Sequence, residues 1–305
     1  MNSRSFPMLV RREFWEHRGL LWAPVGTALM LVVLAFLGRA ATGGLQINVD
    51  GREADFLTAM AGAAQLKFFG VFIGALLVPQ LVVALIVLFF YLLDCLYTER
   101  RDRSILFWKS MPVSDAATVL SKACTALVVV PLLVYALSLV VSVLSFAALA
   151  LKLSGTPYAA IGTWHTGAWL AVQGTLLLNL LVASLWYAPV AAFLLLVSAW
   201  APRAVLLWAS LPPVLLMIAE RTALGTAEIA AFLGYRLTAY FEAIGAAGTR
   251  AASPDTAAQV AVIGDLYNRI SVAPLLANID LWLGVVAAAV MLWGAIRLRR
   301  WRDDG

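Results

Sequence analysis

The segment Asp94–Asp115, DCLYTERRDRSILFWKSMPVSD, separates two long runs of almost uncharged residues. The run before it covers residues 68–93, and the run after it covers residues 123–151. Since about 20 apolar residues cross the hydrocarbon core of a bilayer, each run is long enough to form a membrane span. The segment between them, which we call the hinge (residues 94–115), is rich in arginine and lysine. This charge predicts a cytoplasmic position.

The hinge also carries more apolar surface than a solvated turn needs. It holds five large apolar residues, which are Ile105, Leu106, Phe107, Trp108 and Met111. A short helix that ends at Pro112 and offers such side chains to the cytosol is typical of a surface that binds a partner. The alternative is an ordinary basic loop whose aromatic side chains enter the membrane interface.

The composition places the chain among membrane proteins. Of its 305 residues, 63% are hydrophobic and only 13% are charged, against roughly a quarter charged in soluble domains. The net charge of +5 is explained by basic residues beside the apolar runs, so we do not expect nucleic acid as a partner. Cys95 and Cys124 lie near cytoplasmic span ends, where a disulfide is not expected. The sequence has no metal-ligand cluster and no catalytic motif, so we expect no metal, cofactor or enzymatic activity in this chain.

Six apolar runs predict an all-α polytopic membrane protein in which residues 1–305 form a single transmembrane domain. Ser114 is the predicted N-cap of the helix that leads into the third span. With both termini in the cytoplasm, the predicted inner segments hold 14 of the 22 lysines and arginines, and the short outer segments hold four. This excess supports the orientation. The predicted spans are residues 20–37, 68–93, 123–151, 168–200, 205–219 and 279–296.

Two further helical segments are predicted outside the spans. Residues 1–20 form an interfacial helix on the inner membrane surface. Residues 220–278 form an extracytoplasmic helical segment with two amphipathic helices, over residues 226–245 and 254–270. The first of these helices is predicted to end at Gly245. Its apolar side includes Ile229, Phe232, Leu233, Leu237, Tyr240, Phe241 and Ile244.

The hinge resembles the permease subunits of bacterial type-2 ABC exporters along residues 97–115. The shared features are an acidic residue at the end of the second span and the run Tyr-x-Glu-Arg-Arg-x-Arg-Ser-Ile-Leu-Phe-Trp-Lys-Ser-x-Pro-Val-Ser-Asp. The basic leader, the six spans and the long segment between the fifth and sixth spans agree with the same family in layout. That segment is longer than the short re-entrant helices of polysaccharide exporters, so we transfer no sugar substrate.

The resemblance implies how this protein would work. The hinge would be a coupling helix that rides on a cytoplasmic ATPase subunit, with two such subunits serving two permease chains in the bacterial inner membrane. The chain lacks the P-loop pattern Gly-x-x-x-x-Gly-Lys-Ser/Thr, so ATP and Mg²⁺ would be bound by the partner subunit. The implied ATPase contacts are Glu99, Arg100, Arg101, Arg103, Ile105, Leu106, Phe107, Trp108 and Met111.

Other functions remain open at this point. Asp94 could carry a proton or an ion across the membrane, but a structural ion pair with Arg100, Arg101 or a neighbouring span is the favoured interpretation. A transporter driven by an ion gradient would need charged residues deep in several spans, and apart from Asp94 the spans have almost none. A non-transporting anchor or sensor that presents the external helices would keep the same hinge. The transported substrate cannot be predicted.

Overall fold

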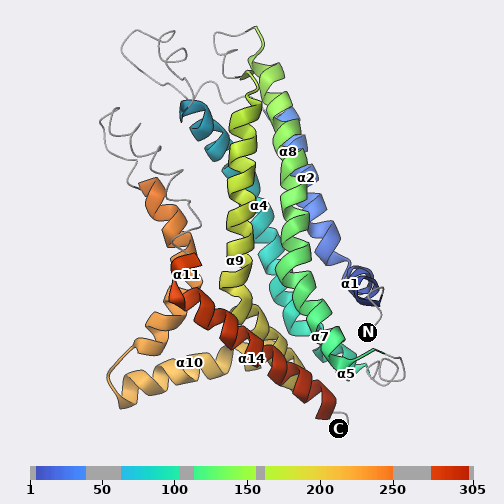
Figure 1. Ribbon diagram of the computed structural model, residues 1–305, viewed down its shortest axis with the longest axis vertical. Coiled ribbons are helices and arrows are strands. Elements are labelled where there is room, and N and C mark those ends of the chain that lie inside the picture. The colour runs from blue at the N-terminus through green and yellow to red at the C-terminus, as the bar shows by residue number, and fades with distance from the viewer. Residues whose placement is uncertain (1–4, 39–62, 103–112, 156–161, 250–275, 302–305) are drawn as a thin grey trace.

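We describe the chain from a computed structural model, which describes residues 5–38, 63–102, 113–155, 162–249 and 276–301 (Figure 1). Within these ranges the chain forms helices joined by short turns, and it forms no strand. The predicted all-α fold class is therefore confirmed. The elements are α1 (Ser5–Glu16), α2 (Gly19–Leu37), α4 (Ala63–Asp94), α5 (Tyr97–Arg101), α7 (Asp115–Cys124), the π-helical turn η1 (Thr125–Val129), α8 (Val130–Leu153), α9 (Thr166–Trp200), α10 (Val205–Ala223), α11 (Glu228–Thr249) and α14 (Ile279–Trp301).

Six helical segments of the described chain are long and apolar enough to cross a membrane, as the sequence predicts. The third begins at Asp115, earlier than the predicted boundary, because Ser114 caps the helix. The Ser114 hydroxyl oxygen accepts a hydrogen bond from the Ala117 backbone N–H at 3.2 Å, which satisfies one of the free donors at a helix start. The six segments are Gly19–Leu37, Phe72–Arg101, Asp115–Leu153, Thr166–Trp200, Val205–Ala223 and Ile279–Trp301.

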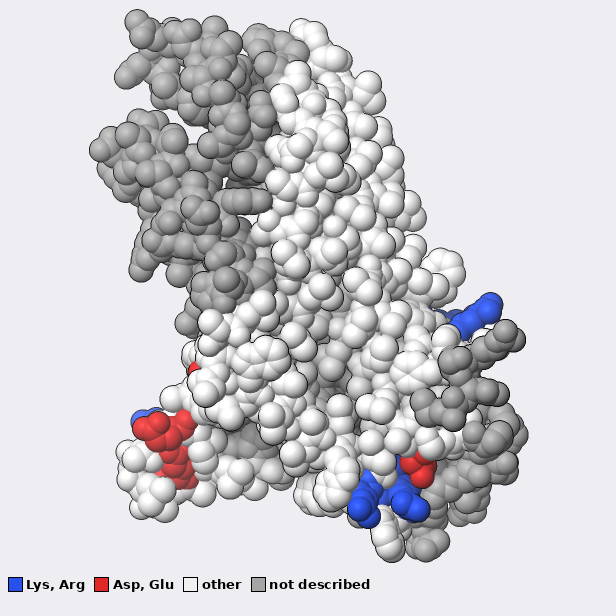
Figure 2. Space-filling model, viewed as in Figure 1, with Lys and Arg blue, Asp and Glu red and all other residues white. Residues whose placement is uncertain are grey.

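The helices α2, α4, α8 and α9 run side by side along the long axis of the molecule (Figure 1). The N- and C-terminal ends both lie at the lower end of this bundle as drawn. On the face shown in Figure 2, the charged side chains gather in the lower half of the molecule, and the described surface above them is uncharged. An apolar upper bundle with charges at one end is the distribution expected of spans that enter a bilayer.

The helix α14 packs along the second half of α9. Ala288 of α14 is buried against Ala188 and Ala192 of α9, and a Cβ added at Gly294 would lie 3.3 Å from a methyl carbon of Leu196. Small residues at such a contact let two helix backbones approach closely, which is how helices associate without a hydrophobic driving force in lipid. The two helices therefore form a tight pair that reaches the lower end of the bundle.

The helix α10 departs from the direction of the bundle. It is long enough for the predicted fifth span, but it lies across the lower end in Figure 1. Ala204, just before it, has a φ of 48° in the left-handed region, which marks the sharp turn out of α9. Only 11% of α10 is buried. The rest of the chain therefore holds this helix weakly, and the surrounding bilayer would set its tilt.

The helix α11 is longer than the sequence predicts, and its apolar side does not face the bundle as predicted. It continues through Gly245 to Thr249, because a glycine inside a helix costs only about 1 kcal/mol relative to alanine. The predicted end at Gly245 is therefore wrong. Part of its predicted apolar side faces outward, since Phe232 is 64% exposed and Leu237 is 50% exposed. The predicted helix over residues 254–270 lies outside the described residues.

The contact of α11 with the bundle is centred on Arg236. The Arg236 side chain is buried, and its guanidinium carbon lies 4.4 Å from the centre of the Trp186 ring of α9. Its Nη1 donates a hydrogen bond to the backbone oxygen of Asp280 at 3.0 Å, and the indole N–H of Trp186 donates to the backbone oxygen of Arg236 at 2.9 Å. The guanidinium fits only because position 284 of α14 is glycine: a Cβ there would lie 2.7 Å from the guanidinium carbon.

Candidate functional site: the anchored hinge

The beginning of the hinge is fixed by Glu99 of α5. Its side chain is almost completely buried, and its carboxylate receives cations from three other helices. The Arg12 Nη2 of α1 lies 2.9 Å from Oε1, and the Lys122 Nζ of α7 lies 3.1 Å from the same oxygen. The Arg299 Nη1 of α14 pairs with Oε2. A carboxylate with three basic partners is held in place by the chain itself.

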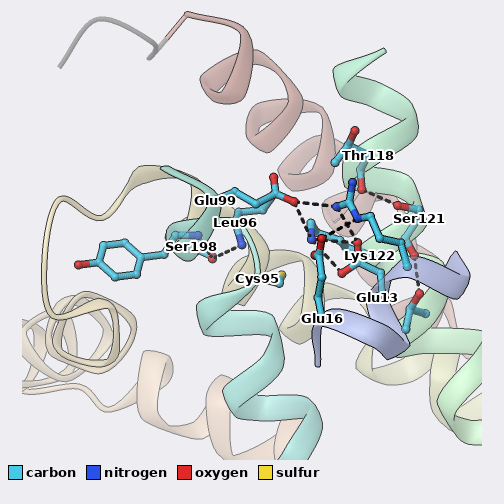
Figure 3. Close-up of polar contacts among 12 residues, drawn as sticks. Glu13, Glu16, Cys95, Leu96, Glu99, Thr118, Ser121, Lys122 and Ser198 are labelled. Atoms are coloured by element: carbon cyan, nitrogen blue, oxygen red, sulfur yellow. Dashed lines mark hydrogen bonds and ion pairs between the residues drawn. The ribbon is translucent and has the colours of Figure 1, made fainter. Parts of the chain in front are cut away.

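The helix that follows the hinge is fixed by Lys122 of α7. Its side chain is fully buried, and its Nζ donates hydrogen bonds to both carboxylate oxygens of Glu13, at 3.0 and 2.9 Å. The Tyr91 hydroxyl of α4 donates a further hydrogen bond to Glu13 at 3.0 Å. Figure 3 shows Glu13, Glu99 and Lys122 converging from separate helices. Lys122 therefore bridges the leader helix and the start of the third span.

These residues form one cluster of balanced charge, which we call the anchor cluster. Arg299 also donates to Asp115 at 3.1 Å, which brings the first residue of α7 into the same network. Among the buried and half-buried groups three cations thus face three anions, and Arg12 also pairs with the more exposed Glu16 at 3.1 Å. Removing one partner from a buried ion pair typically costs 3–5 kcal/mol, because the other charge is left uncompensated. The anchor cluster consists of Arg12, Glu13, Glu99, Asp115, Lys122 and Arg299.

A second set of contacts ties the hinge to α9. The Arg100 guanidinium donates hydrogen bonds to the backbone oxygens of Ser198 and Ala201, at 2.7 and 2.8 Å. The Ser198 hydroxyl oxygen accepts from the backbone N–H groups of Leu96 and Tyr97, at 3.2 and 3.1 Å. A basic side chain at the last carbonyls of a helix satisfies free acceptors and interacts favourably with the helix dipole. The turn between α4 and α5 is therefore fixed to the end of α9.

Two of the predicted ATPase contacts have partners within the chain. Glu99 is buried in the anchor cluster, and the half-buried Arg100 donates to the last carbonyls of α9, so their contact with an ATPase stays a prediction. Arg101 is exposed and pairs with Asp102 at 3.0 Å, in agreement with a solvent-facing position. The remaining predicted contacts lie outside the described residues: Arg103, Ile105, Leu106, Phe107, Trp108 and Met111.

Asp94 also differs from its prediction. Its carboxylate accepts a hydrogen bond from the Thr98 hydroxyl at 2.7 Å. In the described part of the chain no ion pair joins it to a basic side chain, because Arg100 turns to α9 and Arg101 turns to Asp102. The predicted structural ion pair is therefore wrong for these partners.

Sequence reasoning missed the buried partners of the hinge. In the sequence, Lys122 and Arg299 count only among the basic residues that orient the spans, and nothing marks Glu13 as their partner. One usable signal was the position of Lys122, directly before a run of 29 uncharged residues. A lysine so close to a span needs a counter-charge, which the leader helix α1 supplies.

The leader helix brings two more titratable groups to this end of the bundle. Burial raises the pKa of Glu16, whereas burial and the nearby Lys122 lower the pKa of His17. Glu13, Glu16 and His17 lie close enough to offer three ligands to a metal ion. However, Lys122 already binds both carboxylate oxygens of Glu13, so this group is better explained as part of the ion-pair network.

Comparison with protein-family models, with curated proteins and with solved structures gives no match. The likeness of the hinge to exporter permeases therefore stays a prediction. The described contacts fix the hinge mechanically, because the residues at its two ends are bound to α1, α9 and α14.

Proposed function

We propose that this chain is the membrane-spanning permease subunit of an ATP-driven exporter. The hinge contacts a cytoplasmic ATPase, and hydrolysis by that separate subunit moves the spans. Two ATPase subunits act on two permease chains in the bacterial inner membrane, with the hinge and both termini on the cytoplasmic side. The position of both termini at one end of the bundle supports this orientation (Figure 1), as does the excess of basic residues in the predicted inner segments.

The anchor cluster is the observation that carries the proposal. A surface that receives force from an ATPase must be rigidly joined to the helices that it moves. Glu99 lies near the beginning of the hinge and Lys122 shortly after its end, and both are buried in one network with Arg12 of α1 and Arg299 of α14. A displacement of the hinge is therefore passed to the first and last described helices, in addition to the two spans that it connects.

The sequence of the chain fits a complex in which ATP hydrolysis and membrane transport belong to separate subunits. Because the sequence lacks a P-loop, ATP and Mg²⁺ are assigned to the partner, and this chain contributes binding and mechanical coupling. A second permease chain fits the exposed apolar side chains of α10, among them Leu211, Leu215 and Ile218. Lipid or a second copy would cover them, since such a surface is not stable in water.

The proposal is tested at the two large aromatic residues of the hinge. The tagged chain is purified from its native cells, and a bound P-loop ATPase is identified by mass spectrometry and by ATP hydrolysis. We expect the double substitution Phe107→Ala and Trp108→Ala to release the ATPase while the chain still inserts. An aromatic anchor at an interface typically carries ~2 kcal/mol or more, so the pair should weaken binding by well over tenfold.

The matched control removes two exposed aromatic residues elsewhere. Phe232 and Trp282 lie on α11 and α14, away from the hinge, so Phe232→Ala with Trp282→Ala should leave ATPase binding unchanged. Equal retention of the ATPase by both double variants would refute the role of the hinge. The absence of any ATPase from the wild-type complex would refute the exporter proposal as a whole.

A further inference from the structure

An open cavity of about 560 Å³ lies at the lower end of the bundle, beside the anchor cluster, because Tyr91 lines it and also donates a hydrogen bond to Glu13. It is formed by the beginning of α2, the end of α4 and the beginning of α10. Cavities of roughly 300–1,000 Å³ hold small organic ligands in many proteins. Phe90 lines this one and is 58% exposed, so the cavity opens at the surface of α4.

The lining of the cavity is apolar and aromatic with one charge. Phe90, Tyr91 and Tyr97 supply rings, and Leu206 supplies aliphatic surface. Among the described residues that line it, Asp94 is the only acid and no lysine or arginine is present, and burial and Lys122 lower the pKa of the one histidine, His17. No cation in the lining could balance a phosphate, so a zwitterionic phospholipid head group is a poor fit.

The carboxylate of Asp94 has capacity for a further partner. A carboxylate can accept about four hydrogen bonds, and the described contacts of Asp94 consist of the one from Thr98. The aromatic walls favour a cation as well, because the face of an aromatic ring carries negative charge. The guanidinium carbons of Arg100 and Arg101 each lie 5.9 Å from the centre of the Tyr97 ring, so Tyr97 already has cationic partners and Phe90 and Tyr91 supply the other aromatic rings of the lining.

We propose that this cavity binds a lipophilic organic cation, with one positive charge on an apolar body, and that Asp94 is its counter-ion. A quaternary ammonium or phosphonium compound has this chemistry. The apolar body fills the space between α2, α4 and α10, and the aromatic rings and the carboxylate surround the charge. The inference is independent of the proposed exporter function, because binding is a property of this chain alone.

The test uses the full-length chain purified in an uncharged detergent and radiolabelled tetraphenylphosphonium as the probe. Saturable binding is measured by equilibrium dialysis. We expect Asp94→Asn to weaken binding at least tenfold, since the amide keeps the size and the hydrogen bond from Thr98 but removes the charge. Leu206→Trp, which fills the cavity, should weaken binding to a similar extent. Tetraphenylborate, an anion of nearly the same shape, is dialysed against the wild-type chain in a separate experiment, because it would precipitate the probe, and it should show no saturable binding.

The control removes a carboxylate that does not line the cavity. Glu228 is exposed at the start of α11, so Glu228→Gln should bind the probe as the wild type does. Size-exclusion profiles of all variants establish that the fold is kept. Three results would each overturn the proposal: no saturable binding of the probe by the wild type, equal binding by Asp94→Asn, or saturable binding of tetraphenylborate as tight as that of tetraphenylphosphonium.

Discussion

Two buried arginines hold α14, one near each of its ends, and their surroundings are opposite in character. Near the last turn of α14, Arg299 pairs with Glu99 and Asp115 inside the anchor cluster. Near its first turn, Arg236 of α11 is held by the Trp186 ring and by a backbone oxygen of α14. The Nε and Nη2 atoms of Arg236 are buried and have no hydrogen-bond partner among the residues that the structure describes.

The difference teaches which end of α14 is firmly held. A buried guanidinium gains free energy from carboxylates but loses it when N–H groups are removed from water without replacement. Burial accordingly lowers the pKa of Arg236. The lower end of α14 is therefore locked by complementary charge. The contact of its upper end with α11 is held instead by hydrogen bonds and by the Trp186 ring.

The largest expected effect is at the locked end. Replacing Arg299→Met leaves Glu99 and Asp115 short of a cation in a buried site, so we expect a loss of about 3–5 kcal/mol in the free energy of unfolding. Unfolding by sodium dodecyl sulfate in mixed micelles measures this loss. Arg300→Met is the control, because Arg300 is exposed on the same helix, and it should change stability by less than about 0.5 kcal/mol. A small effect of Arg299→Met would mean that the cluster does not lock the helix.

An intermediate effect is expected where α14 makes room for Arg236. In Gly284→Ala the new methyl group displaces the guanidinium from Trp186 and Asp280. Overpacking typically costs about 1–3 kcal/mol, and the better helix propensity of alanine returns up to about 1 kcal/mol. We expect a net loss of about 1–2 kcal/mol in the same unfolding assay. In an Arg236→Met background the sign should reverse, and a loss that persists there would show that another contact is responsible.

The smallest expected effect is the removal of Arg236 itself. Arg236→Met keeps an apolar stem of similar length and eliminates a desolvated, unpaired charge. Replacement of buried ions by apolar side chains is often neutral or stabilising, so stability should stay within about 1 kcal/mol of the wild type. Thermal midpoints of the Arg236→Met and Arg299→Met variants, measured side by side, provide the check. If both variants were equally destabilised, the proposed difference between the two ends would be wrong.

Local patterns in the sequence were sufficient to predict the helices. Long apolar runs depend on composition alone, and the cap at Ser114 depends on residues three positions apart, so both are confirmed. The anchor cluster could not be predicted in this way. Glu13 and Lys122 are separated by 109 positions, and nothing local states which carboxylate meets which amine. The burial of Glu99 follows from these distant partners, so the hinge sequence alone contains no sign of it.

The orientations of α10 and α11 could not be predicted from the sequence either. The composition of α10 shows that it is able to span a membrane, but its direction depends on what surrounds it. The apolar stripe of α11 predicted an inward face, yet the bundle offers Trp186 and a gap at Gly284, and these accept Arg236. An apolar stripe that faces outward suits lipid or a second chain. The periodicity of a single sequence does not indicate which way the stripe faces.

The span of sequence between Glu99 and Arg299 has a consequence for synthesis of the protein. Two hundred positions separate these partners, so α5 and α7 are made long before α14. During that interval Glu13, Glu99 and Asp115 share only Arg12 and Lys122, and the nascent bundle holds one carboxylate too many at its base. A newly made chain therefore has an excess of negative charge at the lower end of the bundle until α14 packs beside α9. Chains that stall or lose this helix would remain recognisable to the quality-control proteases of the membrane.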